Sequence, residues 1–348
     1  MRLSLLIAAG SLLLFPQPAL AQSSPGGVST FPLTAGQRGP VERDTTAFSL
    51  VGVSWDDPAA VFDGSVEVRV RSLAGVWGDW HPLTVEADDR PDTDGPERAR
   101  RGATAPLWVG PSDGVAVRVS GNRPAGLRAE LVDPGTPTAR TLPSAAHEGP
   151  RPGIVTRAGW GADESLREPA FEYTGPVRAV FVHHTDTAND YACSDASKVI
   201  RAIYQYHVKS NGWRDIGYNF LVDRCGTIYE GRAGGVDRPV LGAHTLGFNT
   251  DTAGVAALGR YSSDTVPQAQ VDGIAKAAAW KLGLTGQDAN GSVTLTSASD
   301  GSKFKKGTSA TFRTVSGHRD AFNTECPGNV LYQRLPAIRS WSAHLQGR

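Results

Sequence analysis

The spacing of the apolar residues constrains this fold more than any other feature of the sequence. Between residues 46 and 133 apolar residues alternate with polar ones, as at Val66, Val68 and Val70, and glycines and prolines separate the alternating runs. A period of two predicts strands with one buried face. Because many short strands close most simply as packed sheets, we predict an all-β, sandwich-like domain over residues 46–133.

The pattern changes after residue 133. Residues 134–152 are rich in Pro, Gly and Thr, which is typical of an interdomain linker, and the charged residues 86–103 inside the first domain are expected to form a long loop. Residues 153–345 mix helical and strand patterns, which predicts a second, α/β domain. Two domains agree with a length of 348 residues, because one domain usually takes about 100 to 200.

Individual elements of the second domain can be placed from the sequence. The expected elements are, in chain order, a buried strand at residues 179–182, a helix capped by Asp195, a hairpin of residues 216–222 and 227–230, a buried strand at residues 253–258, a helix opened by Pro267, a β-rich insertion at residues 288–314, and a last helix opened by Pro336. The helix after Pro267 should bury a stripe from Val271 to Leu282. The last helix should bury Ile338 and Leu345.

The N-terminus predicts export. Arg2 precedes an apolar run at residues 3–15, and residues 19–21 form a small-x-small tripeptide, so residues 1–21 are typical of a cleaved secretory signal peptide. A retained membrane anchor is the alternative, but the run is shorter than the roughly 20 residues that span a bilayer. We therefore expect a secreted chain, extracellular or associated with the cell wall, with no membrane span. Lys plus Arg equal Asp plus Glu at 35 each, so nothing indicates a nucleic-acid partner.

Three residues indicate a metal site. His318 and Cys326 lie eight residues apart on a segment bounded by Gly and Pro, and His183 ends the strand expected at residues 179–182. Two imidazoles and a thiolate provide three tetrahedral ligands and leave the fourth position to water. This open position is typical of a catalytic zinc rather than a structural one.

The number of cysteines supports the same assignment. A secreted protein with three cysteines must leave one unpaired, and an unpaired thiol outside the cell is oxidised unless it is buried or bound to a metal. If Cys326 binds the metal, Cys193 and Cys225 are free to form a disulfide.

Motifs of the second half resemble one known family. The motifs are FVHHT at residues 181–185, GWRDIGYNFLV at 212–222, YEGR at 229–232, GAHT at 242–245, GFN at 247–249 and GHRD at 317–320. They resemble the peptidoglycan recognition proteins, which belong with the type 2 N-acetylmuramoyl-L-alanine amidases, from about Ile154 to Arg339. The resemblance implies a mixed β-sheet flanked by helices, with Zn²⁺ at one end of a groove for peptidoglycan. It also implies hydrolysis of the amide between N-acetylmuramic acid and the first L-alanine of the stem peptide.

The resemblance also assigns roles to single residues. It places the zinc ligands on His183, His318 and Cys326, and the catalytic tyrosine on Tyr218. Thr324 occupies a position where bacteriophage members carry lysine and amidase-active recognition proteins carry threonine, and we expect it to hydrogen-bond the transition state. Members without activity typically lack the cysteine, so the presence of Cys326 favours an enzyme.

The chemistry expected of the site follows from its charges. A thiolate and two neutral imidazoles leave the zinc site net positive, so that it lowers the pKa of bound water toward about 7 and polarises the amide carbonyl. A tyrosine hydroxyl, with an ordinary pKa near 10, is a poor base at neutral pH, so Tyr218 should hydrogen-bond the attacking water or the oxyanion. The sequence does not identify the group that protonates the leaving amine.

Substrate binding is expected of His244, Trp213 and Asn249. For His244 a simple hydrogen bond within its loop is an equal alternative, and Trp213 is as well suited to a buried aromatic role. Nearer the metal ligands, His184 should point to the opposite face of its strand and pack there. Glu230 is a second candidate for the general base.

Two other readings of the sequence stay open. One is a non-hydrolytic protein that binds peptidoglycan, which the complete set of metal ligands disfavours. The other is that the first domain binds the cell wall. In that reading its tryptophans stack on sugar rings, although tryptophans of a β-domain more often lie in the core. The residues concerned are Trp55, Trp77, Trp80 and Trp108.

Overall fold

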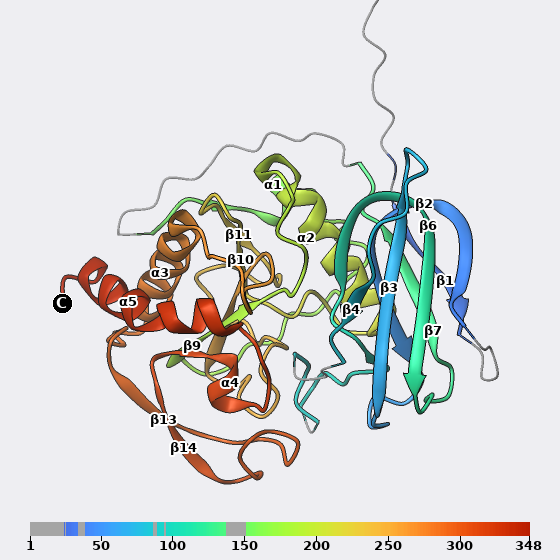
Figure 1. The fold of residues 1–348 in the computed structure, drawn as a ribbon. Helices are drawn as coiled ribbons and strands as arrows, with labels where there is room; N and C mark the ends of the chain where they lie inside the picture. Colours follow the sequence, from blue (N-terminus) through green and yellow to red (C-terminus); the bar gives the residue numbers. More distant parts are fainter. Residues whose placement is uncertain (1–23, 25, 34–38, 86–88, 94, 137–150) are drawn as a thin grey trace, which may run out of the picture.

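The structure is a computed structural model that describes residues 24, 26–33, 39–85, 89–93, 95–136 and 151–348. The expected signal peptide and most of the expected linker lie outside these residues. Two domains lie side by side, a β-domain drawn in blue to green and an α/β domain drawn in green to red (Figure 1). Within the described ranges no helix combines the length and the apolar character needed to cross a bilayer.

The first domain is all β, as predicted. Its strands are β1 (Gly27–Pro32), β2 (Val41–Trp55), β3 (Gly64–Ser72), β4 (His81–Leu83), β5 (Gly102–Ala103), β6 (Leu107–Gly121) and β7 (Arg128–Asp133). They form one sheet in the order β1-β7-β2-β6-β3-β4, with β5 paired to β2. The sheet begins before residue 46, because β1 pairs with β7 and β2 starts at Val41. Register shifts between β2 and β6 mark irregularities that let long strands bend.

The two faces of β2 serve different cores. Val51 and Val53 pack inside the β-domain, whereas Leu50, which points to the other face, joins Trp108 and Val132 against the α/β domain. The period of two in the sequence thus encodes both a domain core and a docking face. The two domains share a continuous apolar interface.

The tryptophans of the first domain divide into two pairs. Trp55 and Trp108 are buried, so neither side chain is available at the surface. Trp77 and Trp80 are partly exposed and lie beneath guanidinium groups, with Arg69 5.0 Å from the Trp77 ring and Arg118 4.3 Å from the Trp80 ring. Only this second pair stays compatible with stacking on a ligand.

The second domain is built on a mixed sheet flanked by helices. Its strands are β8 (Ile154–Val155), β9 (Ala179–His184), β10 (Phe220–Val222), β11 (Ile228–Glu230), β12 (Thr252–Ala257) and β15 (Val315–Gly317), in the order β15-β9-β12-β10-β11-β8. The pairs are parallel except for the antiparallel hairpin β10–β11. An additional hairpin, β13 (Ser292–Thr296) with β14 (Ser309–Arg313), forms the predicted β-rich insertion.

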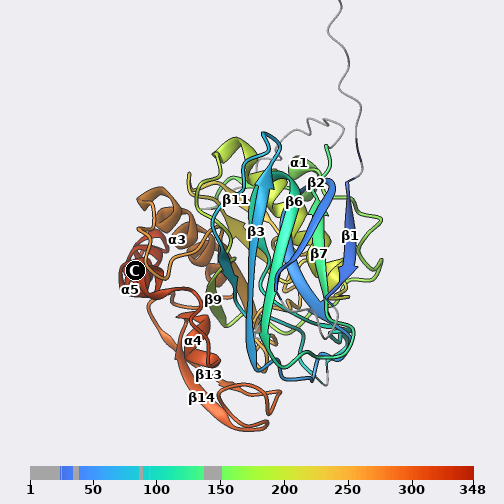
Figure 2. The ribbon, with the colours of Figure 1, turned by 45° about the vertical axis from the view of Figure 1, so that its right-hand side comes forward.

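Helices cover both faces of this sheet. The helices are α1 (Arg157–Trp160), α2 (Ala196–Gln205), α3 (Gln268–Gly283), α4 (His318–Ala321) and α5 (Asn329–Leu345). Phe220 and Val222 of β10 pack with the residues of α3 and α5, whereas Leu221 between them packs with those of α2. Both views place α3 and α5 on the side of the domain away from the β-domain (Figures 1 and 2). Helix α2 is the element against which the first domain docks.

One expected helix start was confirmed and two other boundaries were wrong. Helix α2 begins directly after Asp195, although the Asp195 side chain makes no cap hydrogen bond and instead accepts one from Lys198. The first strand of the hairpin is only Phe220–Val222. The last helix begins at Asn329 rather than Pro336.

The early start of α5 has a packing reason. Leu331, Leu335 and Ile338 are buried on one face and hold the helix together across Pro336, whose own side chain is exposed. Leu345, expected to be buried, is only partly so. By contrast, Pro267 precedes α3 as predicted, and Val271 and Leu282 both lie in the core.

Candidate metal centre

The parallel sheet brings His183 and His318 together. His183 is the penultimate residue of β9, and β15 pairs with β9 so that Gly317 lies opposite Val182. Because neighbouring parallel strands end at the same edge of a sheet, His318, the residue after β15, arrives beside His183. The two imidazole ring centroids are 4.4 Å apart.

Cys326 completes the group from the loop between α4 and α5. Its Sγ lies 3.8 Å from His183 Nδ1. One donor atom from each of His183, His318 and Cys326 lies within 4.8 Å of the others, and all three side chains are buried. The structure therefore places the three predicted ligands around one point.

The chemistry of the three donors fits zinc. Two imidazole nitrogens and a sulfur form a donor set that suits Zn²⁺ rather than Mg²⁺ or Ca²⁺, which prefer oxygen. Burial lowers the pKa of His183 and of His318 to about 3, so both rings are neutral at pH 7. The neutral imidazole is the form that binds a metal.

Backbone hydrogen bonds hold the Cys326 loop. The Cys326 N–H donates to Thr324 Oγ1 at 3.0 Å, and the Arg319 N–H donates to the Cys326 carbonyl at 3.0 Å. The His184 N–H points at Sγ, 3.4 Å away. Thr324 thus orients the cysteine, a function distinct from the transition-state role expected of it, which stays a prediction.

Residues next to the ligands have structural partners. His184 Nδ1 accepts a hydrogen bond from the Tyr261 N–H, as a packed residue would, but His184 also lines the pocket described below. Asp320 accepts one from the Gly317 N–H and so caps the turn that carries His318. The Glu230 carboxylate accepts from the Arg157 N–H and does not line the pocket described below.

His244 lies behind His183. Its ring is fully buried, 5.2 Å from the His183 ring, and His183 Nε2 is 3.3 Å from both His244 Nδ1 and Thr245 Oγ1. Partners on the outer nitrogen of a ligand histidine fix its orientation toward the metal. His244 therefore supports a ligand in this structure and does not line the pocket, so its expected contact with substrate stays a prediction.

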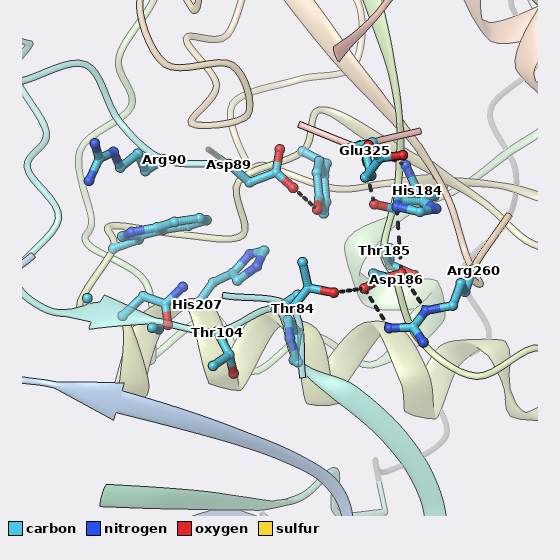
Figure 3. Close-up of a pocket in the computed structure, with 18 of the residues that line it drawn as sticks. Thr84, Asp89, Arg90, Thr104, His184, Thr185, Asp186, His207, Arg260 and Glu325 are labelled. Carbon is cyan, nitrogen blue, oxygen red and sulfur yellow. Dashed lines mark hydrogen bonds and ion pairs between the residues drawn. The ribbon is translucent and has the colours of Figure 1, made fainter. Parts of the chain in front are cut away.

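A pocket of about 320 Å³ opens beside the metal centre. Tyr218, Trp213 and Cys326 line it from the α/β domain. Asp89 and Thr104, which are labelled in Figure 3, line it from the β-domain. The expected residues Tyr218 and Trp213 are thus brought to the site. Asn249 is buried near its edge, where its side chain donates to the Arg90 carbonyl and to Asp92.

Asp89 is a site residue that the sequence analysis missed. Its Oδ1 lies 3.0 Å from His183 Nδ1 and 3.2 Å from His318 Nδ1, and its Oδ2 accepts a 2.6 Å hydrogen bond from the Tyr218 hydroxyl. Burial raises the pKa of this carboxyl to about 6. The only sequence signal was an acidic residue within the charged loop of residues 86–103, and such residues are usually solvated.

The disulfide predicted from cysteine parity is present. Cys193 and Cys225 are bonded, and Cys326 is the buried cysteine outside this bond. The bond ties the start of α2 to the β10–β11 hairpin, next to the sheet edge that carries the site.

The second domain is an α/β domain with a candidate metal centre. Its mixed sheet presents two histidines and a cysteine at one edge, beside a pocket, and these donors suit zinc. The family described as N-acetylmuramoyl-L-alanine amidase matches residues 173–329. A peptidoglycan recognition protein of Trichoplusia ni is 30% identical over 194 residues, which cover 56% of this chain and 89% of that protein. The chain belongs to the family of peptidoglycan recognition proteins and type 2 amidases.

Two further likenesses cover the second domain, and one covers the first. The human N-acetylmuramoyl-L-alanine amidase is 30% identical over 196 residues, 55% of this chain and 28% of that protein. The solved structure of Drosophila PGRP-LB is 27% identical and covers 55% of this chain and 95% of that chain, with a TM-score of 0.42. Residues 16–149 match the family described as Rv3811 N-terminal galactose-binding domain-like.

Proposed function

We propose that this protein is a zinc-dependent N-acetylmuramoyl-L-alanine amidase, which hydrolyses the amide between N-acetylmuramic acid and L-alanine in peptidoglycan. The convergence of His183, His318 and Cys326 within 4.8 Å carries the proposal. Relatives in this family are named as recognition proteins or as an amidase, so membership alone does not decide activity. A complete set of three ligands, with a fourth position for solvent, favours the enzyme.

The residues around the centre support hydrolysis of an amide. When bound, zinc supplies a Lewis acid that activates water and polarises the scissile carbonyl. Tyr218, whose ring lies 5.5 Å from that of His183, is proposed to donate a hydrogen bond to the oxygen that gains charge once its hydroxyl no longer donates to Asp89. Thr245 and His244 keep His183 oriented, and Thr324 keeps Cys326 oriented.

Substrate contacts are proposed for the residues at the pocket and its edge. Trp213 is buried against His207, with ring centroids 4.4 Å apart, and lines the pocket, where the uncovered part of its ring is proposed to contact a sugar or a lactyl group. Asn249 and His244 complete the proposed set, and contact with Asn249 depends on release of the segment now bonded to it. The disulfide supports a location outside the cytoplasm, where peptidoglycan lies.

The proposal is tested by dye release from labelled cell walls. Release should stop when a chelator removes the metal and return when Zn²⁺ is added. His183→Ala should lose both zinc and activity, whereas His344→Ala, which alters an exposed histidine, should keep both. Release that survives the chelator and His183→Ala would contradict a zinc mechanism. Binding to walls without release in any metal state would favour a non-hydrolytic recognition protein.

A further inference from the structure

A segment of the β-domain reaches across the metal centre. We call residues 89–93 and 95–101, which lie between β4 and β5, the strap. Figure 1 shows this teal segment between the two domains. Its first residue, Asp89, contacts both ligand histidines and Tyr218. The strap therefore brings a carboxylate of one domain into the catalytic site of the other.

The donor atoms that lie within 4.8 Å of one another belong to His183, His318 and Cys326, and Asp89 Oδ1 lies beside the two histidines of this group. Oδ1 is 3.0 and 3.2 Å from the two histidine Nδ1 atoms, and Cys326 Sγ is 3.8 Å from His183 Nδ1. Donors bound at about 2.0–2.3 Å to one tetrahedral zinc lie roughly 3.3–3.6 Å from one another. Carboxylate oxygen is a zinc donor, and ligand carboxylates are themselves hydrogen-bonded, as Oδ2 is to Tyr218.

We propose that Asp89 is a fourth protein ligand of the metal, and that the strap closes the site against water and substrate until it is displaced. The inference rests on the metal site of the proposed function. Four protein ligands are typical of structural zinc, whereas catalytic zinc keeps one position open. Because Asp89 also engages the Tyr218 hydroxyl, closure removes the open position and the proposed hydrogen-bond donor together.

Further acidic side chains of the strap accept hydrogen bonds from donors of the α/β domain. Asp92 Oδ1 accepts hydrogen bonds from the Gly247 N–H at 2.5 Å and from Asn249 Nδ2 at 3.0 Å. Glu97 accepts from the Arg214 N–H at 2.9 Å and pairs with Arg232. A substrate that carries carboxylate and amide groups would compete for the same donors.

The strap can open without separation of the domains. Docking depends on the apolar cluster in which Leu50, Trp108 and Val132 meet α2, and on Tyr206, whose hydroxyl is 3.0 Å from the Thr104 carbonyl. None of these contacts involves the strap. Its hold on the site is polar and ionic. The buried Glu97–Arg232 pair anchors residues 95–101, so opening consists of residues 89–93 exchanging their contacts for water or substrate while the apolar interface stays closed.

The test compares Asp89→Ala with wild type in the full chain. Asp79→Ala, an exposed aspartate of the same domain, is the matched control, and Asp89→Asn, which keeps the shape of the side chain, guards against misfolding. Three quantities are measured: the zinc dissociation constant by competition with a chromophoric chelator, the visible spectrum of the Co²⁺-substituted protein, and hydrolysis of a soluble muramoyl peptide.

Both Asp89 variants should bind zinc at least about tenfold more weakly. Loss of a residue that only hydrogen-bonds a metal ligand already lowers metal affinity about tenfold or more. Their Co²⁺ spectrum should change as solvent replaces the carboxylate. Hydrolysis should rise about tenfold if one molecule in ten is open in the wild type. Asp79→Ala should match the wild type in all three quantities.

Specific results would overturn the inference. A zinc affinity within twofold of wild type, with an unchanged Co²⁺ spectrum, refutes ligation by Asp89. Slower hydrolysis by Asp89→Ala than by wild type refutes closure and makes Asp89 part of the catalytic machinery. If Asp89→Ala weakens zinc binding but no form of the protein hydrolyses the peptide, the ligand assignment stands and the amidase proposal fails.

Discussion

Glu97 of the β-domain and Arg232 of the α/β domain form a buried ion pair, with Oε2 2.5 Å from Nη1 and about a twentieth of each side chain exposed, at 5% and 6%. Arg232 also donates to the carbonyls of Ile216 and Leu241. The guanidinium of the second domain therefore has its counter-charge in the first. The pair links the strap to the sheet that carries the metal ligands.

Glu97→Gln should lower the free energy of unfolding by about 3 kcal/mol, because a buried Arg232 charge would lose its partner. Urea unfolding followed by circular dichroism measures the change. Glu67→Gln, which breaks the exposed pair with Arg118, should leave the midpoint unchanged. A loss below about 1 kcal/mol for Glu97→Gln would show that the pair contributes little.

Gly52→Ala should disturb the docking of the two domains. A Cβ at Gly52 would lie 2.4 Å from the Tyr206 ring, which is fully buried between the domains. We expect a loss of about 1–3 kcal/mol, as for overpacking of a core. The control is Gly27→Ala in β1, where an added Cβ meets nothing within 4 Å. Equal melting temperatures for the two variants would contradict tight docking at this point.

The Cys193–Cys225 disulfide should stabilise the fold. The two residues are separated by 32 positions, and closing a loop of that size in the unfolded chain is worth about 3–4 kcal/mol. The double variant Cys193→Ala/Cys225→Ala should lose this amount in urea unfolding and still bind zinc, since Cys326 is untouched. Loss of zinc from a folded double variant would mean that the disulfide also shapes the metal centre.

Tyr218→Phe tests the proposed hydrogen bond to the oxyanion. In wild type the same change would also release Asp89, so it is best measured in an Asp89→Ala background. There we expect kcat to fall about 100-fold, as when one oxyanion donor is removed, with zinc content unchanged. A kcat within threefold of that of the Asp89→Ala protein would show that Tyr218 has no catalytic role.

The metal ligands were predictable because residue type, spacing and the resemblance to a known family all indicate them. The parallel pairing of β15 with β9, which brings the two imidazoles together, was not predicted. Cysteine parity supported the assignment of Cys326. Local information failed at Pro336, where a buried stripe outweighed the usual helix signal. At Asp195 it predicted the start of the helix but not the hydrogen bond of the side chain, which goes to Lys198.

Asp89 could not be predicted, because its role depends on how two domains meet. The charges of residues 86–103 indicate a solvated loop, and only the docking of β2 and β6 against α2 brings that loop to the metal centre. Asp92 and Glu97 are likewise paired only across the interface. Long-range pairing of charges leaves no periodic pattern in a sequence.

Mass spectrometry of the products from purified peptidoglycan tests the central claim most directly. Wild type, Asp89→Ala and Cys326→Ser are incubated with intact walls. The account predicts stem peptides with a free L-alanine amino terminus from Asp89→Ala, fewer from wild type and none from Cys326→Ser. Absence of these peptides from both wild type and Asp89→Ala, or equal yields from Cys326→Ser, would contradict it.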